Sequence, residues 1–264
     1  MKNIITLSIL IISTVFQLQA GENEKTAETS YKKDSKVFAK ALKGSTIDLP
    51  VFDQKSASAV LLKSPKQSKN WLFLYHDRWG LTETVLQEAH TLWKDLKNVN
   101  VLVIDLNDGI QPQSRSEAMR LLIENDVDRD KSIIKSAITF AGKDAKIGSI
   151  GWCNGGSWSL QTAMLAKEQE VACVVYYGMP DFNTQKLHQI ESDVLAIYGT
   201  RDTYVTPTIA KAFKSKMLAA GKDVVELNYE SKGNFADRNS LQYNYSNASD
   251  AYVKVLKYLQ AKYE

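Results

Sequence analysis

The sequence has 264 residues, 24% of them charged and 44% hydrophobic, and a formal net charge of +3. This length is large for one average domain but normal for one α/β domain with a lead-in segment. Charges of both signs are interspersed, and no Lys/Arg block alternates with aromatic residues as a nucleic-acid surface requires. Charge therefore argues against nucleic acid as a partner and identifies no other partner.

Residues 1–20 have the layout of a secretory signal peptide: Lys2, an apolar run from Ile4 to Phe16, and Ala20 before a charged stretch. The run is short for a membrane span, and no later segment approaches ~18 consecutive apolar residues. We expect cleavage after Ala20 and a secreted or periplasmic protein of 244 residues (264 − 20) that does not bind membranes. An uncleaved anchor is the alternative.

The remaining chain divides into a charged lead-in, residues 21–45, which is expected to be flexible or loosely helical, and an alternating region, residues 46–264. Apolar runs predict strands at 71–75, 99–106, 145–151, 171–177, 194–198 and 224–229. Helical patterns fall at 83–96, 116–123, 130–141, 157–167, 208–220 and 248–261. Strands alternating with helices predict an α/β fold with a mostly parallel sheet covered by helices on both faces.

The segment Gly151-Trp152-Cys153-Asn154-Gly155 follows the expected strand 145–151 and has the spacing of a nucleophile elbow with sulfur in place of oxygen. Flanking glycines remove side chains that would clash in so tight a turn. The following helix N-terminus is expected to favour the thiolate of Cys153, the form that attacks. The structural alternative is an ordinary strand-to-helix turn that holds a packed cysteine.

Two other expected strand ends supply matching groups. Asp202 follows strand 194–198, lies 49 residues after Cys153, and fits the triad acid, although a helix-capping aspartate would look the same. The loop after strand 71–75 is where this architecture takes one oxyanion-hole N–H, which we place at Arg78. The second N–H belongs to Asn154, the residue after the nucleophile.

With these motifs in order, the chain from about residue 71 to its end resembles the dienelactone hydrolase family of α/β-hydrolases. The matching segments are HDRWGL (76–81), IDLNDG (104–109), GWCNGG (151–156), GTRDTYVTP (199–207) and FADR (235–238). The resemblance implies Cys153 as the nucleophile and Asp202 as the triad acid. It also implies that Asp77 stands where the family has a glutamate that partners the resting thiol. It implies no cofactor and no metal.

The triad histidine is missing, because Gly233 occupies the position two residues before Phe235 where the family places it. A thiol needs a base, and the leaving alkoxide needs a proton donor, so this loss should reduce the rate by several powers of ten. His76, beside the oxyanion loop, is a candidate surrogate base. His188 is a second candidate, and each is otherwise explained as a histidine with an ordinary structural role.

The positions for substrate recognition also depart from the family. Gly109 and Asp237 stand where members acting on dienelactone carry arginines, and Arg238 is displaced by one residue, so the carboxylate clamp is out of register. Dienelactone itself is therefore not the expected substrate. Trp79, Trp152 and Trp158 are expected around the pocket and favour an apolar acyl or aromatic group, with Trp79, Trp152 and Arg238 as the substrate-binding candidates.

Three functions remain to be compared. The first is an exported thiol esterase that opens a small carboxylic ester or lactone through a Cys153 acyl-enzyme. The second is a catalytically silent hydrolase fold that serves as a binding or accessory protein, as the residue at 233 suggests. The third, a thiol redox protein, lacks a C-x-x-C pair. Cys173 lies within an apolar strand, so we expect it to be buried and unpaired with Cys153.

Overall fold

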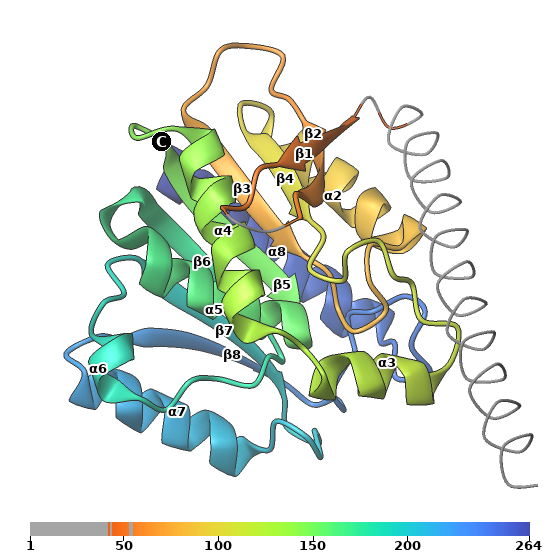
Figure 1. Ribbon diagram of the computed structural model, residues 1–264. Coiled ribbons are helices and arrows are strands. Elements are labelled where there is room, and N and C mark those ends of the chain that lie inside the picture. The colour runs from red at the N-terminus through yellow and green to blue at the C-terminus, as the bar shows by residue number, and fades with distance from the viewer. Residues whose placement is uncertain (1–41, 43, 53–54) are drawn as a thin grey trace, which may run out of the picture.

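The computed structural model describes residue 42, residues 44–52 and residues 55–264. The expected signal peptide lies outside the described residues, as does the expected lead-in except for residues 42, 44 and 45. The described residues form one eight-stranded sheet with helices on both of its faces (Figure 1). The strands are β1 (Ser45–Leu49), β2 (Ala57–Leu62), β3 (Asn70–Tyr75), β4 (Asn100–Ile104), β5 (Lys146–Trp152), β6 (Glu170–Tyr176), β7 (Asp193–Gly199) and β8 (Val224–Tyr229).

The sheet order is β1-β2-β4-β3-β5-β6-β7-β8. β2 pairs antiparallel with both β1 and β4, and every pair from β4 to β8 is parallel. The chain therefore folds as the expected α/β structure around a mostly parallel sheet. Because parallel strands end at the same edge, the loops that follow β3, β5, β6, β7 and β8 gather on one side of the molecule.

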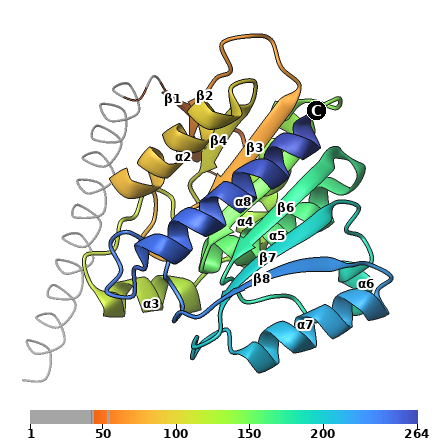
Figure 2. The same ribbon diagram turned by 180° about the vertical axis from the view of Figure 1, so that it is seen from behind.

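The helices lie in two layers. α2 (Glu83–Leu96) and α8 (Tyr245–Tyr263) cover one face, which Figure 2 shows from the front. The other face carries α4 (Val127–Ala141), α5 (Asn154–Ala166) and α7 (Pro207–Ala219). Three short elements complete the set: α3 (Arg115–Ile123), η1 (Lys167–Gln169) and α6 (Thr184–Leu187).

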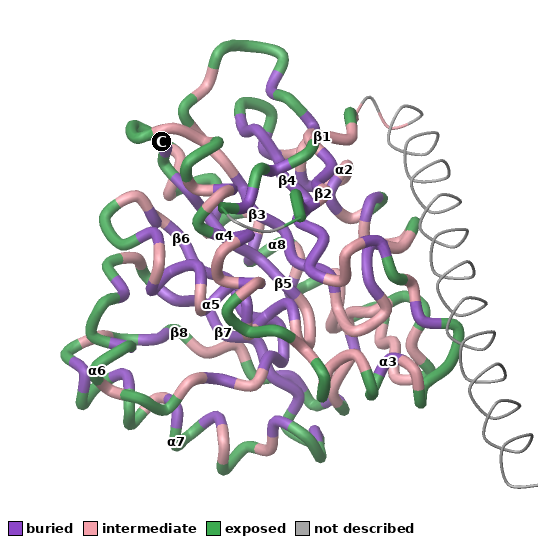
Figure 3. Tube along the Cα trace, viewed as in Figure 1, coloured by how far each residue is buried: buried purple, intermediate pink, exposed green. Residues whose placement is uncertain are grey.

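Burial explains why the central strands read as continuous apolar runs. Leu72, Phe73, Leu74 and Tyr75 of β3 all have no exposed surface, because helices cover both sides of the sheet. α2 is amphipathic instead: Thr82 caps its N-terminus, and its buried residues recur every three or four positions on the side that faces the sheet. Figure 3 shows the same pattern, with buried strands inside and exposed outer helix faces. None of the described helices is long and apolar enough to cross a membrane.

Some elements differ from the sequence expectation. β1, β2 and α6 were not expected, and β1 begins at Ser45, the last residue of the expected lead-in. α5 begins at Asn154, three residues before the expected start at residue 157, so Gly155 and Gly156 are helical. Neighbouring backbone leaves no room for a side chain at Gly155 and little room at Gly156, which explains glycine at these positions, and neither residue ends or delays the helix.

Candidate active site

Cys153 lies at the turn between β5 and α5 in a backbone conformation that residues with side chains rarely adopt. Its φ is 54° and its ψ is −119°. The turn is fixed on both sides, since the Cys153 N–H donates to the Tyr176 carbonyl at 2.9 Å and the Cys153 carbonyl accepts from the Gly156 N–H at 3.0 Å. Such strain costs roughly 1–3 kcal/mol and persists where the surrounding structure imposes it, commonly at functional sites.

The glycines on either side of Cys153 allow this turn. A Cβ at Gly151 would lie 2.1 Å from the Gly155 carbonyl oxygen. A Cβ at Gly155 would lie 2.4 Å from the His76 carbonyl oxygen and 2.5 Å from that of Tyr75. β3, β5 and α5 can therefore approach closely only with glycine at both positions. The backbone has the strand-turn-helix geometry that an exposed nucleophile requires.

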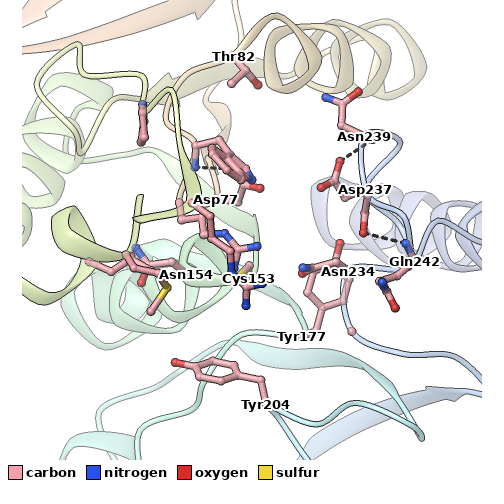
Figure 4. Close-up of a pocket in the computed structure, with 18 of the residues that line it drawn as sticks. Asp77, Thr82, Cys153, Asn154, Tyr177, Tyr204, Asn234, Asp237, Asn239 and Gln242 are labelled. Atoms are coloured by element: carbon pink, nitrogen blue, oxygen red, sulfur yellow. Dashed lines mark hydrogen bonds between the residues drawn. The ribbon is translucent and has the colours of Figure 1, made fainter. Parts of the chain in front are cut away.

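A cavity of about 1110 Å³ opens beside Cys153 at the carboxyl ends of the parallel strands (Figure 4). It is lined by residues that follow six strands, and Gln111 and Pro112 represent the segment after β4. The others include Asp77, Arg78 and Trp79 after β3, Cys153 and Asn154 after β5, Tyr177 and Met179 after β6, Asp202, Thr203 and Tyr204 after β7, and Gly233, Asn234 and Asp237 after β8. The structure thus brings Cys153, Asp202, Asp77, Asn154, Arg78 and Trp79 to one cavity.

Asp202 is nearly buried and is held by its own loop. Its Oδ1 accepts the N–H groups of Tyr204 at 2.7 Å and Val205 at 3.1 Å. Its Oδ2 faces Gly233, where a Cβ would lie 2.4 Å away. Asp202 and position 233 therefore touch, as the acid and the histidine of a triad would.

The loop after β3 is organised around Asp77, whose Oδ1 accepts the Trp79 N–H at 2.9 Å and whose carbonyl accepts the Gly80 N–H at 3.2 Å. The Arg78 N–H between them donates no hydrogen bond to any described residue. Asn154 is the first residue of α5, so its N–H lacks an acceptor within the helix. The Arg78 N–H is therefore open to a ligand in the cavity, and among the described residues the Asn154 N–H has no acceptor other than the Cys153 sulfur.

Burial and the nearby Asp77 carboxylate favour the protonated form of the Cys153 thiol. Burial raises the pKa of Cys153, and Asp77 raises it further, while Arg78 and the Asn154 N–H lower it less. The Asn154 N–H at the start of α5 acts in the expected direction and favours the thiolate, but burial and the nearby Asp77 carboxylate outweigh it in the resting site. Burial also raises the pKa of Asp77 itself, with a further contribution from Asp237.

The candidate surrogate bases lie elsewhere. His76 is buried, its Nδ1 lies 2.6 Å from the Asp77 carbonyl oxygen, and its Nε2 accepts the Leu106 N–H at 3.0 Å. Both ring nitrogens are thus bonded to backbone, and His76 does not line the cavity. His188 is exposed, with its Nδ1 3.0 Å from the Ala220 carbonyl oxygen, and also lies outside the cavity.

Among the substrate-binding candidates, Trp79 lines the cavity, and Trp152 and Arg238 do not. Trp152 stacks on Tyr176 with ring centroids 5.4 Å apart, and Trp158 is buried in the core on the α4 and α5 side. The Arg238 Nε pairs with Glu88 Oε1 at 3.0 Å. These three residues have structural partners that the sequence pattern did not indicate.

The sequence expectation did not include Tyr177 among the site residues and placed it as the last residue of strand 171–177. Tyr177 instead follows β6 with a φ of 40°, lines the cavity, and is 2% exposed. Its hydroxyl has no hydrogen-bond partner among the described residues, and burial raises its pKa well above the usual value, so it stays protonated. Its place at a strand's carboxyl end, level with the elbow, is the signal that could have identified it.

The sheet order and the strained cysteine turn at the carboxyl ends of its strands define an α/β-hydrolase. The model of the dienelactone hydrolase family matches residues 59–263, and the chain belongs to this family.

Solved structures and a sequence relative agree with this membership. A Klebsiella pneumoniae protein assigned as a dienelactone hydrolase superposes with a TM-score of 0.71 at 16% identity, over 82% of this chain and 97% of that one. A dienelactone hydrolase-like promiscuous phosphotriesterase from metagenomic libraries gives 0.71 at 15%, over 84% and 99%. Protein usf of Aquifex pyrophilus is 22% identical over 62% of this chain and 74% of its own length. At these identities the structural likeness concerns the fold.

Proposed function

We propose that this family member hydrolyses a small carboxylic ester or lactone through an acyl-enzyme on Cys153. The observation that carries the proposal is the strained turn at Cys153, which faces the cavity between two N–H groups, those of Asn154 and Arg78, that have no oxygen acceptor among the described residues. Two such donors aimed at a developing oxyanion contribute on the order of 3 kcal/mol each to transition-state stabilisation.

In the proposed reaction the Cys153 sulfur attacks the acyl carbon, the oxyanion accepts the two N–H groups, and the carbon–oxygen bond to the leaving alcohol breaks. Asp77 is the acceptor for the thiol proton, which it then passes to the leaving alkoxide. Its burial and the neighbouring Asp237 raise its pKa, which makes it a stronger base than an ordinary carboxylate. Water then attacks the thioester and restores the thiol.

The proposed substrate differs from dienelactone in having no carboxylate that the protein must clamp. Trp79 offers an apolar wall for an acyl or aromatic group. Gly109 and Asp237 occupy the two positions where the family has arginines, and Arg238 is paired with Glu88 outside the cavity. The clamp expected for dienelactone carboxylate is therefore absent from the positions that carry it in the family.

The second candidate is a catalytically silent fold that binds a small ligand in the same cavity. Gly233 favours it, because position 233 supplies no imidazole to Asp202. The two candidates differ in one measurable event, the formation of a covalent bond to Cys153.

The test is intact-protein mass spectrometry after incubation with p-nitrophenyl acetate. We expect one acetyl adduct on Cys153 in the wild type and in the Cys173→Ala variant, and none in Cys153→Ala. Cys173→Ala is the matched control because it removes a thiol of the same chain from outside the cavity. Ligand binding without any adduct would support the silent candidate instead.

We also propose export, on the basis of Lys2, the run from Ile4 to Phe16 and Ala20. Mass spectrometry of protein recovered from the periplasm or the medium should find a new N-terminus at Gly21. Mature protein that retains Met1 would refute cleavage.

A further inference from the structure

The cavity contains an acceptor that no described residue satisfies. Asp202 uses Oδ1 for two backbone N–H groups, whereas Oδ2 accepts no hydrogen bond from the described residues. Oδ2 lies against Gly233, which has no side chain to offer, and both residues line the cavity with Cys153. The acid and the nucleophile of a triad therefore face one space without the group that normally connects them.

A second unsatisfied group faces the same cavity. The Tyr177 hydroxyl is fully buried and has no partner in the described part of the chain. Buried polar groups are nearly always hydrogen-bonded, so an orphaned hydroxyl that lines a cavity indicates a polar ligand there. Tyr177 follows β6 with a left-handed backbone, and its side chain lines the cavity (Figure 4).

The charges favour a ligand that donates N–H. Asp77, Asp202 and Asp237 all line the cavity. Of the cations that line it, Arg115 and Lys232 are exposed, and the Arg78 guanidinium packs 5.6 Å from the centroid of the Trp79 ring. The side of the cavity formed by the β7 and β8 loops, at Asp202 and Asp237, thus presents carboxylates to an incoming group.

We propose that the space between Asp202, Tyr177 and Cys153 binds the imidazole ring of a ligand, which completes the triad. The inference rests on the proposed acyl-enzyme chemistry. When the ring is bound, its N–H donates to Asp202 Oδ2, and its other nitrogen replaces Asp77 as the acceptor of the Cys153 thiol proton. The thiolate forms the bond to the acyl carbon, and the imidazolium returns the proton to the leaving alkoxide. In the second half-reaction the ring takes a proton from the attacking water and returns it to the departing thiolate.

The imidazole can come from a small molecule or from a histidine of a peptide substrate or partner protein. Both sources present the same ring, and neither needs a covalent link to residue 233. This matters because a Cβ at 233 would lie 2.4 Å from Asp202 Oδ2 and 2.8 Å from its Cγ. Gly233→His would therefore force the Asp202 carboxylate to shift away from position 233, so we expect free imidazole to restore more activity than this substitution.

The experiment measures hydrolysis of p-nitrophenyl butyrate with increasing imidazole. The Cys153→Ala rate is subtracted, because imidazole attacks such esters by itself. We expect a saturable acceleration of about 10-fold or more, within the ~10²–10⁴-fold that a positioned acid–base group contributes. 1-Methylimidazole is the matched control: it keeps the basic nitrogen and lacks the N–H, so it should give no saturable effect. In Asp202→Asn an amide N–H group replaces the acceptor Oδ2, so the ring N–H has no acceptor and the acceleration should be abolished.

A dipeptide that contains histidine distinguishes the two sources. Half-saturation at a lower concentration than for free imidazole supports a peptide or protein histidine, and the reverse order supports a small molecule. A linear response equal to that of Cys153→Ala, or equal rescue by 1-methylimidazole, overturns the inference. If Cys153 is still acetylated without imidazole in that case, the proposed function stands. If no adduct forms with or without imidazole, both the imidazole inference and the proposed acyl-enzyme function are wrong.

Discussion

The two cysteines show how the same side chain acquires different chemistry from its place in the sheet. Cys173 lies within β6, has no exposed surface, and its Sγ is 3.5 Å from the Ser159 hydroxyl. Burial, with a further contribution from Glu170, raises its pKa to about 12. Cys153 follows β5 on a strained turn and lines the cavity.

Both thiols have raised pKa values, and burial is the largest cause for each. The direction of the pKa shift therefore does not distinguish them. The differences are access to a ligand, adjacent N–H groups without an oxygen acceptor in the described part of the chain, and a backbone conformation that the glycines on either side permit. A reactive cysteine in this fold is better recognised by its backbone and its cavity than by the pKa of its thiol.

The largest expected effect is on alkylation. Iodoacetamide should modify Cys153 of the native protein on the order of 10³-fold faster than Cys173, because Cys173 reacts only when β6 opens. Peptide mass spectrometry over time gives both rates. The Cys153 rate should increase with pH, because its pKa is raised and the thiolate is the reacting form. Similar rates for the two thiols would contradict the geometry of the turn.

The next effect concerns the turn itself. Gly155→Ala should lower the free energy of unfolding by about 3 kcal/mol or more, because its Cβ meets the carbonyl oxygens of Tyr75 and His76 in the core. Gly221→Ala is the control: its φ is 73° but nothing lies within 4 Å of the added Cβ. It should cost only about 1–2 kcal/mol of backbone strain. Urea unfolding gives both values, and equal losses would mean that packing at Gly155 is relaxed.

Asp77→Asn should change two reactivities of Cys153 in opposite directions. Removal of the carboxylate lowers the pKa of the thiol, so alkylation near neutral pH should become several-fold faster. Acylation by p-nitrophenyl acetate should become about 10²-fold slower, because the proposed proton acceptor is lost. Stopped-flow release of p-nitrophenol gives the second rate. A parallel rise or fall of both rates would remove Asp77 from the role of base.

The fold could be predicted where periodicity was strong. The sequence pattern predicted the six strands β3 to β8 and six of the helices. Buried parallel strands are continuously apolar, and α2 repeats its apolar residues at helical spacing. β1 and β2 were not predicted, because their sequences, STIDL and ASAVLL, are short and mix polar with apolar residues. Gly155 and Gly156 suggested a later start of α5, whereas tertiary packing against β3 and β6 is what requires them.

Chain order predicted which loops would meet, since parallel strands end at one edge of the sheet. Cys153, Asp202 and Asp77 accordingly line one cavity. Side-chain direction could not be predicted in this way. Tyr177 enters the cavity because of its positive φ, and Trp152 leaves it to stack on Tyr176. Both outcomes depend on backbone angles that a single sequence does not encode locally.

The polar cluster around Cys173 leads to the smallest effect. Glu170 is 3% exposed, its Oε1 accepts the Ser149 hydroxyl at 2.5 Å, and its Oε2 has no partner among the described residues. Burial raises the pKa of Glu170 well above its usual value, so the folded protein holds this carboxyl protonated. The unfolded chain releases that proton above a pH of about 4.3.

Folding stability should therefore decrease as pH rises from about 4.3 toward the raised pKa, by up to ~1.4 kcal/mol per pH unit for this one proton. Glu170→Gln copies the shape of the protonated acid and cannot ionise, so it should remove this part of the decline. We expect the free energy of unfolding of the variant, relative to wild type, to increase between pH 5 and pH 8. Urea unfolding across that range measures it, with Glu168→Gln at an exposed position as the control for the change in charge. A constant difference would mean that Glu170 is ionised in the folded state.

Because Glu170 lies outside the cavity, Cys153 alkylation at fixed pH should stay unchanged in the Glu170→Gln variant. That result would separate the polar cluster at Glu170 from the reactive site at Cys153.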